Sequence, residues 1–247
     1  MTRAAGFRAE FADFLRFVRR PGLRRAPRRA AGSLWAADWR PGMSLRRLLA
    51  WAGCLWAVNL FALGPLALAA AGAGGAAHRI DLESLPWLQA IFWAPLVEEL
   101  LFRYGLRRPL QALWLAPVMA AVVLHGAQAW TGALAAAAVG AAWLQSQGGR
   151  RLRGWRWRRF YARRFGWFFH AATLAFAGMH LANYTLNQMP YWLMPLLVLP
   201  QWVTGLALGW LRVRRGIGAA VLLHAVFNGG PVLLALLIMQ AAPELAS

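Results

Sequence analysis

Long apolar segments separated by short clusters of arginine are the feature that most constrains the fold of this chain. Residues 113–145, for example, contain no acidic residue, lysine or arginine. A helix needs about 20 apolar residues to cross a bilayer, so this pattern predicts an all-α polytopic membrane helix bundle. Only 14% of the residues are charged, against about 25% in soluble domains, which argues against a soluble globular protein. Cys54 is the only cysteine, which excludes a disulfide scaffold.

The charged residues are strongly unbalanced toward arginine. The chain has 27 basic residues, all arginine, against 8 acidic residues, for a net charge of +19. The arginines lie between apolar segments, as cytoplasmic membrane anchors do, and not on one polar face. This position favours a bilayer with anionic headgroups as the partner and argues against nucleic acid. The arginine usage and the alanine richness suggest a plasma membrane, such as a bacterial inner membrane.

The first 47 residues form a basic arm, which we predict to be cytoplasmic. Phe7, Phe11, Phe14, Leu15 and Val18 have helical spacing among arginines, so we expect an amphipathic interfacial helix on the membrane surface. A solvated arm with a chance pattern is the alternative. No cleavable signal peptide is expected, because the first 20 residues lack an uninterrupted apolar core.

The positive-inside rule predicts about seven transmembrane helices within residues 48–247. The expected spans are about 48–73, 85–102, two helices within 113–145, 165–183, 191–211 and 217–241. A break near Gly126 divides 113–145, which brings the basic loops 1–48, 103–112, 147–164 and 212–216 to the side of the N-terminus. Arg79 is then the only arginine outside. With the basic loop Arg150–Arg164, the pair forms a predicted inserted hairpin, residues 113–164.

Charged side chains inside a predicted span mark the first candidate site. An ionisable residue at membrane depth is costly and is a functional hypothesis by default. Glu99 and Arg103 are four residues apart on a helix and can pair. Glu98 lies about 100° round the helix and needs another partner: a metal, a water, a histidine or a proton. A buried glutamate near an imidazole can act as a general base. The alternative is a helix end with a surface ion pair.

Two further polar pairs occupy later spans. Phe176 and His180 share one helix face, with Gly178 between them to permit close helix approach. His224 and Asn228 also share a face, so we expect a common partner, and an asparagine amide is a suitable oxyanion donor. The alternative for both histidines is a hydrogen-bonded packing role. The sequence Gly229-Gly230-Pro231 predicts a kink or opening just beyond Asn228.

Taken together, these motifs resemble the CAAX prenyl protease and bacteriocin-processing family, also called the CPBP or Abi family. Its pattern is Glu-Glu-x-x-x-Arg, Phe-x-x-x-His and His-x-x-x-Asn on separate membrane helices. The resemblance covers about residues 85–232 and implies a glutamate-dependent intramembrane endopeptidase. Glu98 with His180 would activate water, while His224 and Asn228 would stabilise the oxyanion. Glu99 and Arg103 would support the site.

The donor set leaves two chemistries open. Glu98, His180 and His224 could bind a divalent metal such as zinc with an open fourth position, or they could act on water directly. The second motif also lies unusually far from the first for this family. His125 is therefore a rival for His180, although Ala121 stands where the motif expects phenylalanine.

Three functions are compatible with the sequence. An endopeptidase acting on a peptide or membrane-anchored protein is favoured, because none of the motif residues is missing. A proton-coupled or ion-coupled transporter would be expected to show repeated broken helices in two halves, which the chain lacks. A non-catalytic scaffold or immunity-type protein with the same fold is the remaining alternative.

Overall fold

A computed structural model of the protein describes residues 6–25, 35–79, 86–147 and 155–241. Nearly all of them are helical, and the one strand pair described, Ala77–His78 with Tyr184–Thr185, is antiparallel and two residues long. The predicted all-α class is therefore confirmed apart from this short pairing. Asp81 and Glu83 of the first outer loop, and Arg150–Gly154 of the basic loop, lie outside the described residues.

The helices run along the chain in the following order. They are α1 (Phe7–Arg19), α2 (Trp35–Trp39), α3 (Leu45–Val58), α4 (Gly64–Gly74), α5 (Ala94–Phe102), α6 (Pro109–His125), α7 (Ala129–Gln147), α8 (Trp155–Met179), α9 (Met194–Leu197), α10 (Leu199–Arg215) and α11 (Ile217–Ala241). Two π-helical turns, Asn59–Leu63 and Gln89–Trp93, precede α4 and α5. Two 3₁₀ turns, Tyr104–Leu106 and His180–Asn183, follow α5 and α8.

Two helical stretches of the described chain are long and apolar enough to cross a membrane. They are Leu45–Gly74 and Ile217–Leu234, and Pro109–His125 is a shorter apolar helix. Phe61 and Leu68 on the first stretch are 84% and 75% exposed. Large apolar side chains exposed in this way suit a lipid environment, so this is a membrane protein. The predicted number of seven spans is not confirmed by this criterion.

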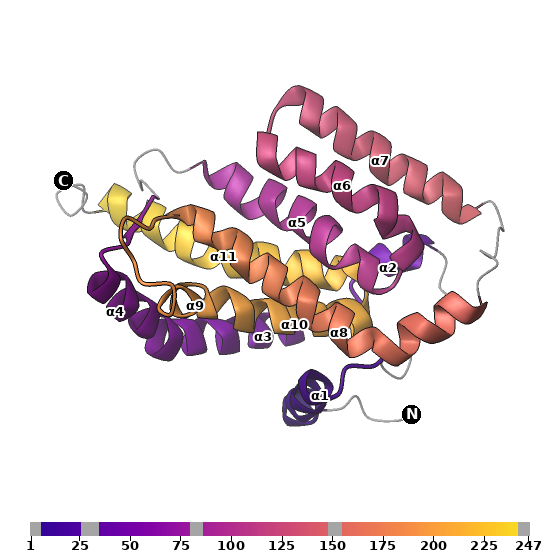
Figure 1. Ribbon diagram of the computed structural model, residues 1–247, viewed down its shortest axis with the longest axis horizontal. Coiled ribbons are helices and arrows are strands. Elements are labelled where there is room, and N and C mark those ends of the chain that lie inside the picture. The colour runs from indigo at the N-terminus through magenta and orange to yellow at the C-terminus, as the bar shows by residue number, and fades with distance from the viewer. Residues whose placement is uncertain (1–5, 26–34, 80–85, 148–154, 242–247) are drawn as a thin grey trace.

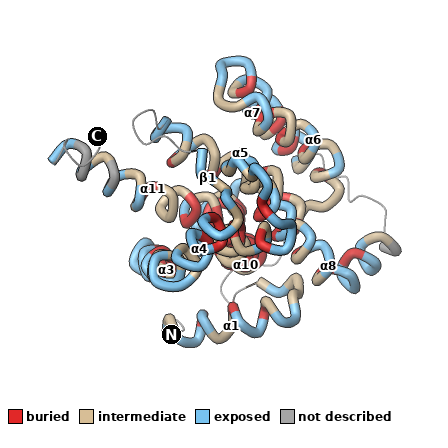
Figure 2. The backbone as a smooth tube through the Cα atoms, turned by 60° about the vertical axis from the view of Figure 1, so that its left-hand side comes forward, coloured by how far each residue is buried: buried red, intermediate tan, exposed pale blue. Residues whose placement is uncertain are grey.

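The long helices lie side by side around a central core (Figure 1). Helix α10 contacts α8 and α11, while α11 contacts α3 and α5. Buried residues gather in the middle of the bundle, and α6 and α7 project from this centre (Figure 2). The predicted break at Gly126 is confirmed: α6 ends at His125 and α7 begins at Ala129. This hairpin packs through α6 against the outside of α5.

Helix α8 differs from its prediction at its beginning. Residues from Trp155 onward are helical, where we expected a basic loop up to Arg164. Tyr161, Phe165, Phe169 and Phe176 are buried along one face, with the spacing of a helix that packs on a neighbour. This apolar face continues the helix beyond the arginine cluster and explains the earlier start.

Close packing of α8 depends on glycines of α10. A Cβ atom at Gly209 would lie 2.7 Å from the Phe169 ring, and one at Gly205 would lie 3.0 Å from Phe176. Gly178, which we expected to serve this purpose, has nothing within 4 Å of its Cβ position. The close approach therefore comes from α10 and not from the second motif.

Helix α1 forms as predicted, but only part of its apolar face is exposed and the rest packs on the bundle. Phe17 packs on Phe169 with ring centroids 5.1 Å apart, and Phe14 packs on Trp210 at 5.9 Å. Phe11 and Leu15 are 36% and 44% exposed. The helix expected on lipid is therefore docked partly on the bundle, with part of its apolar face left exposed.

Helix α11 is continuous through Pro231, where we expected a kink or opening. Proline lacks the N–H that would bond the carbonyl four residues earlier, at Phe227. The Trp56 indole donates to that carbonyl instead, at 2.9 Å. Gly230 makes room, since a Cβ there would lie 2.2 Å from the Trp56 ring. A side chain of α3 thus replaces the missing backbone bond.

Candidate active site

The three motifs come together from three parts of the bundle. Helix α5 carries Glu98 and Glu99, α8 ends just before His180, and α11 carries His224 and Asn228. Helix α5 contacts both α8 and α11. The π-helical turn before α5 also contacts α11, which places Asn228 beside it.

Glu99 is the central acceptor of the site. Its Oε1 accepts from Nη1 of Arg103 at 2.9 Å and from Nδ1 of His224 at 3.0 Å. Glu99 is fully buried, and Arg103 and His224 are 1% and 3% exposed. The predicted Glu99–Arg103 pair is therefore present, and the alternative of a surface ion pair is wrong. The contact to His224 was not expected from the sequence.

The hydrogen bond from His224 fixes the role of each ring nitrogen. A carboxylate can only accept, so Nδ1 of His224 carries the donated proton. Its Nε2 then faces Glu98, at 3.8 Å from Oε2. That oxygen is buried and has no hydrogen-bond partner within the part of the chain that is described. An acceptor in this state, beside an imidazole, suits proton transfer to and from a small polar molecule.

The ring of Phe176 packs between the polar side chains of the site. The guanidinium carbon of Arg103 lies 3.7 Å from the Phe176 ring centroid. The rings of His180 and His224 lie 4.6 Å and 5.7 Å from the same centroid. The aromatic residue of the second motif thus packs against three polar side chains at once, and its π face interacts favourably with the buried cation.

His180 joins the site at the end of α8. Its Nδ1 donates to the carbonyl oxygen of Phe176 at 2.7 Å, which leaves Nε2 as the available ring nitrogen. The imidazole is close enough to Glu98 and His224 for electrostatic interaction with both. The sequence alone placed His180 deeper in the membrane than Glu98 and His224, and the packing of α8 against α5 and α10 brings it near them.

Asn228 has a partner that the sequence did not reveal. Its Nδ2 donates to the carbonyl of Ala90 at 3.0 Å, within the π-helical turn before α5. Such turns widen the helix and occur often at functional sites. One amide hydrogen is used in this bond and the second remains available. His224 and Asn228 therefore do not share the single partner that we expected.

His125, the rival for His180, lies on the hairpin. It is exposed at the end of α6, where its Nδ1 bonds the carbonyl of Ala121 at 2.9 Å. Its ring packs on Trp130 at 5.0 Å. The structure brings His180, and not His125, toward Glu98.

The metal-binding interpretation has mixed support. Both motif histidines bond through Nδ1 to a carboxylate or a carbonyl, as metal-ligating histidines commonly do. However, within the described ranges no group of three or more His, Cys, Asp or Glu side chains is arranged to hold a metal ion. The residues as placed do not fit a three-ligand zinc site, so the chemistry proposed below uses side chains alone.

Sequence reasoning missed two buried charges next to the site, Asp38 and Arg212. Arg212 stands in a cluster with Arg214 and Arg215 that has the composition of a membrane anchor. Asp38 is an isolated acid in the arginine-rich arm. Neither has a local pattern that predicts burial, because their pairing joins positions 174 residues apart.

Residues 151–230 match the model of one protein family, described as type II CAAX prenyl endopeptidase Rce1-like. The match covers about a third of the chain and includes His180, His224 and Asn228. Glu98 and Glu99 lie outside it. No curated protein and no solved structure matches the chain. The matched segment and the three motifs agree that this chain resembles the CAAX prenyl protease and bacteriocin-processing family.

Proposed function

We propose that this protein is a membrane-embedded endopeptidase that cleaves a peptide or a membrane-anchored protein. The observation that carries the proposal is the buried Oε2 of Glu98, which accepts no hydrogen bond from the described residues and lies 3.8 Å from Nε2 of His224. The match of residues 151–230 to a CAAX prenyl endopeptidase family supports this reaction class.

In the proposed reaction, Glu98 removes a proton from a water molecule, which His180 Nε2 orients. The water oxygen attacks the scissile carbonyl carbon and forms a tetrahedral intermediate. His224 and the second amide hydrogen of Asn228 stabilise its oxyanion. Glu98 then returns the proton to the amine nitrogen as the C–N bond breaks, so one water is consumed for each bond cleaved.

Glu99 supports this sequence by its two hydrogen bonds. Its bond to Nδ1 fixes the orientation of the His224 ring. Arg103 in turn neutralises Glu99, which would otherwise be an unpaired buried carboxylate. Both residues act through His224 and do not touch the reacting atoms in this scheme.

We further propose seven membrane crossings, with the N-terminus in the cytoplasm and the protein in a plasma membrane. The end of α5, the beginning of α11 and the arginines of α8 would then face the same side. Glu98 lies about 6 Å along its helix from that end, and His224 about 10 Å, at 1.5 Å per residue. A substrate would be cut near the cytoplasmic membrane surface, where exposed arginines contact anionic headgroups.

The test is proteolysis by the purified full-length protein in nanodiscs. A library of fluorogenic peptides, free and membrane-anchored, is compared for wild type, Glu98→Gln and the matched control His125→Ala. We expect Glu98→Gln to lose about 10²–10⁴-fold in rate, as for removal of a general base, and His125→Ala to retain activity.

Equal activity of Glu98→Gln and wild type would contradict the proposed base. If both the wild type and Glu98→Gln are folded and neither cleaves any peptide, the non-catalytic scaffold is favoured. A parallel assay with a chelator tests the side-chain scheme, which predicts unchanged activity. Loss of activity that zinc restores would overturn that scheme.

A further inference from the structure

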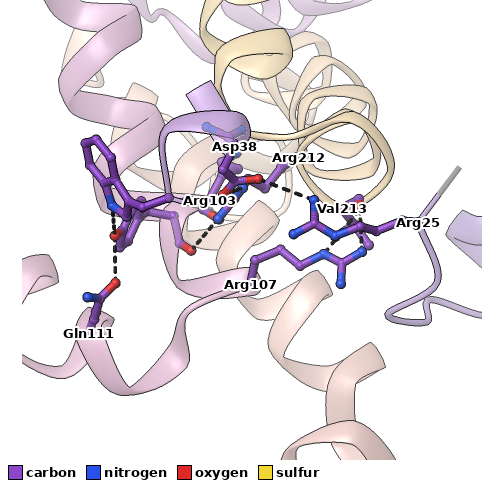
Figure 3. Close-up of polar contacts among 9 residues, drawn as sticks. Arg25, Asp38, Arg103, Arg107, Gln111, Arg212 and Val213 are labelled. Carbon is purple, nitrogen blue, oxygen red and sulfur yellow. Dashed lines mark hydrogen bonds and ion pairs between the residues drawn. The ribbon is translucent and has the colours of Figure 1, made fainter. Parts of the chain in front are cut away.

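Arg212, near the end of α10, is a fully buried cation with three partners. Its Nε donates to the carbonyl of Arg103 at 3.0 Å, and its Nη2 donates to the carbonyl of Tyr104 at 3.1 Å. Its Nη1 donates to Oδ2 of Asp38 at 2.5 Å. Figure 3 shows Arg212 between Arg103 and Asp38, with the guanidinium toward both.

Two of these partners are carbonyls of Arg103, the last residue of the first motif, and of Tyr104, the residue after it. The C-terminus of a helix is the negative end of the helix dipole, so a cation near the carbonyls there is favourable. Helix α5 ends at Phe102, and Arg212 binds the two carbonyls that follow. The backbone of Arg103, from which the side chain reaches Glu99, is therefore held by its own N–H bond to the Glu99 carbonyl and, in addition, by a residue of another helix.

This contact connects Arg212 to the proposed active site through a short series of bonds. Arg212 holds the Arg103 carbonyl, Arg103 Nη1 binds Glu99 Oε1, and Glu99 Oε1 binds His224 Nδ1. Every residue in the series is at most 3% exposed. A shift of the α5 end would thus be transmitted to the imidazole with little compensation from solvent.

The counter-ion of Arg212 comes from the N-terminal arm. Asp38 lies in α2 and is 2% exposed. The arm is also tied to α5 by Trp35, whose indole donates to the Tyr104 hydroxyl at 2.9 Å. That hydroxyl donates to Gln111 of α6 at 2.7 Å. The arm is packed closely on α11 as well, because a Cβ at Gly218 would lie 1.8 Å from the Trp39 carbonyl oxygen.

We propose that Asp38 and Arg212 are positioning residues of the active site, so that the arm segment Trp35–Trp39 is a part of the catalytic unit. Asp38 neutralises and orients Arg212, and Arg212 holds the end of α5 at the place where Glu99 can align His224. The expected effect of Asp38 and Arg212 on catalysis rests on the proposed peptidase function.

The chain offers a matched control for this inference. Asp13 of α1 binds Arg214 at 2.9 Å, so it also links the arm to α10. Arg214 lies two residues from Arg212, but its other bond goes to the carbonyl of Arg24 in the arm. Asp38→Asn removes the ion pairs of Asp38 with Arg212 and Arg25, and Asp13→Asn removes the ion pair of Asp13 with Arg214. Both variants weaken the contact of the arm with α10, and only the first involves the end of α5.

The experiment compares kcat and KM for full-length Asp38→Asn, Asp38→Glu and Asp13→Asn. We expect Asp38→Asn to lower kcat by about 10²-fold with little change in KM, as for misplacement of a catalytic group. Asp38→Glu should recover part of the loss, and Asp13→Asn should stay near wild type. Equal kcat for Asp38→Asn and Asp13→Asn would overturn the proposal.

Two further measurements separate positioning from folding and from the proposed function. Asp38→Leu combined with Arg212→Met replaces the buried ion pair by apolar groups, which often preserves stability. This variant should stay folded with low kcat, and wild-type kcat in it would overturn the proposal.

Hydrogen exchange at the amides of Leu106 and Arg107, which bond the Arg103 and Tyr104 carbonyls, should accelerate in Asp38→Asn but not in Asp13→Asn. Equal exchange in the two would overturn the proposal. If the wild type cleaves no peptide, the proposed function fails, and this comparison alone decides whether Asp38 holds the end of α5.

Discussion

Glu99 and His224 are joined by a 3.0 Å hydrogen bond across 125 positions of the sequence. The bond couples the first and third motifs directly, and it gives Glu99 two cationic or polar partners on one oxygen. The two consecutive glutamates therefore face different nitrogens of one imidazole. Glu99 accepts from Nδ1, and Glu98 has an oxygen 3.8 Å from Nε2 that accepts no hydrogen bond from the residues the structure describes.

Glu99→Gln should destabilise the protein because it leaves Arg103 buried without its counter-ion. Removal of one partner of a buried pair costs about 3–5 kcal/mol. The measurement is reversible unfolding of the detergent-solubilised protein. Asp13→Asn breaks a more exposed pair, for which we expect about 0–1 kcal/mol. Similar losses for both variants would contradict the central role of Glu99.

Asn228→Ala should lower kcat by about 10²–10³-fold, the range for one oxyanion donor, with KM nearly unchanged. Kinetics and thermal unfolding are measured on the same preparation. A lowered unfolding temperature with normal kcat would instead assign Asn228 to anchoring the Ala90 carbonyl alone.

Gly218→Ala should weaken docking of the arm, since its Cβ would overlap the Trp39 carbonyl oxygen. We expect a loss of about 1–3 kcal/mol in unfolding free energy, as for other overpacked sites. Gly53→Ala is the control, because nothing lies within 4 Å of its Cβ position in helix α3. That change should stabilise the protein by about 0.4–1 kcal/mol. The opposite order of stability would show that the arm does not pack as described.

Acid should weaken the contact between Asp38 and Arg212. Burial acts to raise the pKa of Asp38, but Arg212 and Arg25 outweigh it and hold the pKa below its ordinary value of 3.8. The unfolded chain therefore binds this proton first, so the stabilisation is complete above about pH 4 and is lost as the pH falls through the folded pKa. Unfolding curves of wild type and Asp38→Asn should differ at neutral pH and converge in acid. A constant difference would refute the assignment.

Cysteine labelling tests the proposed orientation. In a Cys54→Ser background, cysteines at the exposed positions Arg19 and Arg163 should react with an impermeant reagent from the same side. A cysteine at the exposed position Gln188 should react from the opposite side. Arg19 and Arg163 on opposite sides would contradict the seven crossings.

The sequence predicts best what depends on local spacing. The break at Gly126, the amphipathic α1 and the Glu99–Arg103 pair follow from helical periodicity and turn residues, and all three are present. The start of α8 was missed because eight arginines mask the apolar face of Tyr161 and Phe165. The sequence could not predict two further contacts, the bond between Trp56 and Phe227 and the pairing of Asp38 with Arg212. Both join segments that are far apart in the chain.

The separation of Asp38 and Arg212 has a consequence for biosynthesis. A ribosome adds about 5–20 residues per second, so the 174 positions between them take about 9–35 s to make. The arm emerges first but cannot bind its partner until α10 has been synthesised. His224 and Asn228 of α11 are added later still, so the arm would take its place on the bundle in the same late stage of synthesis that completes the proposed active site.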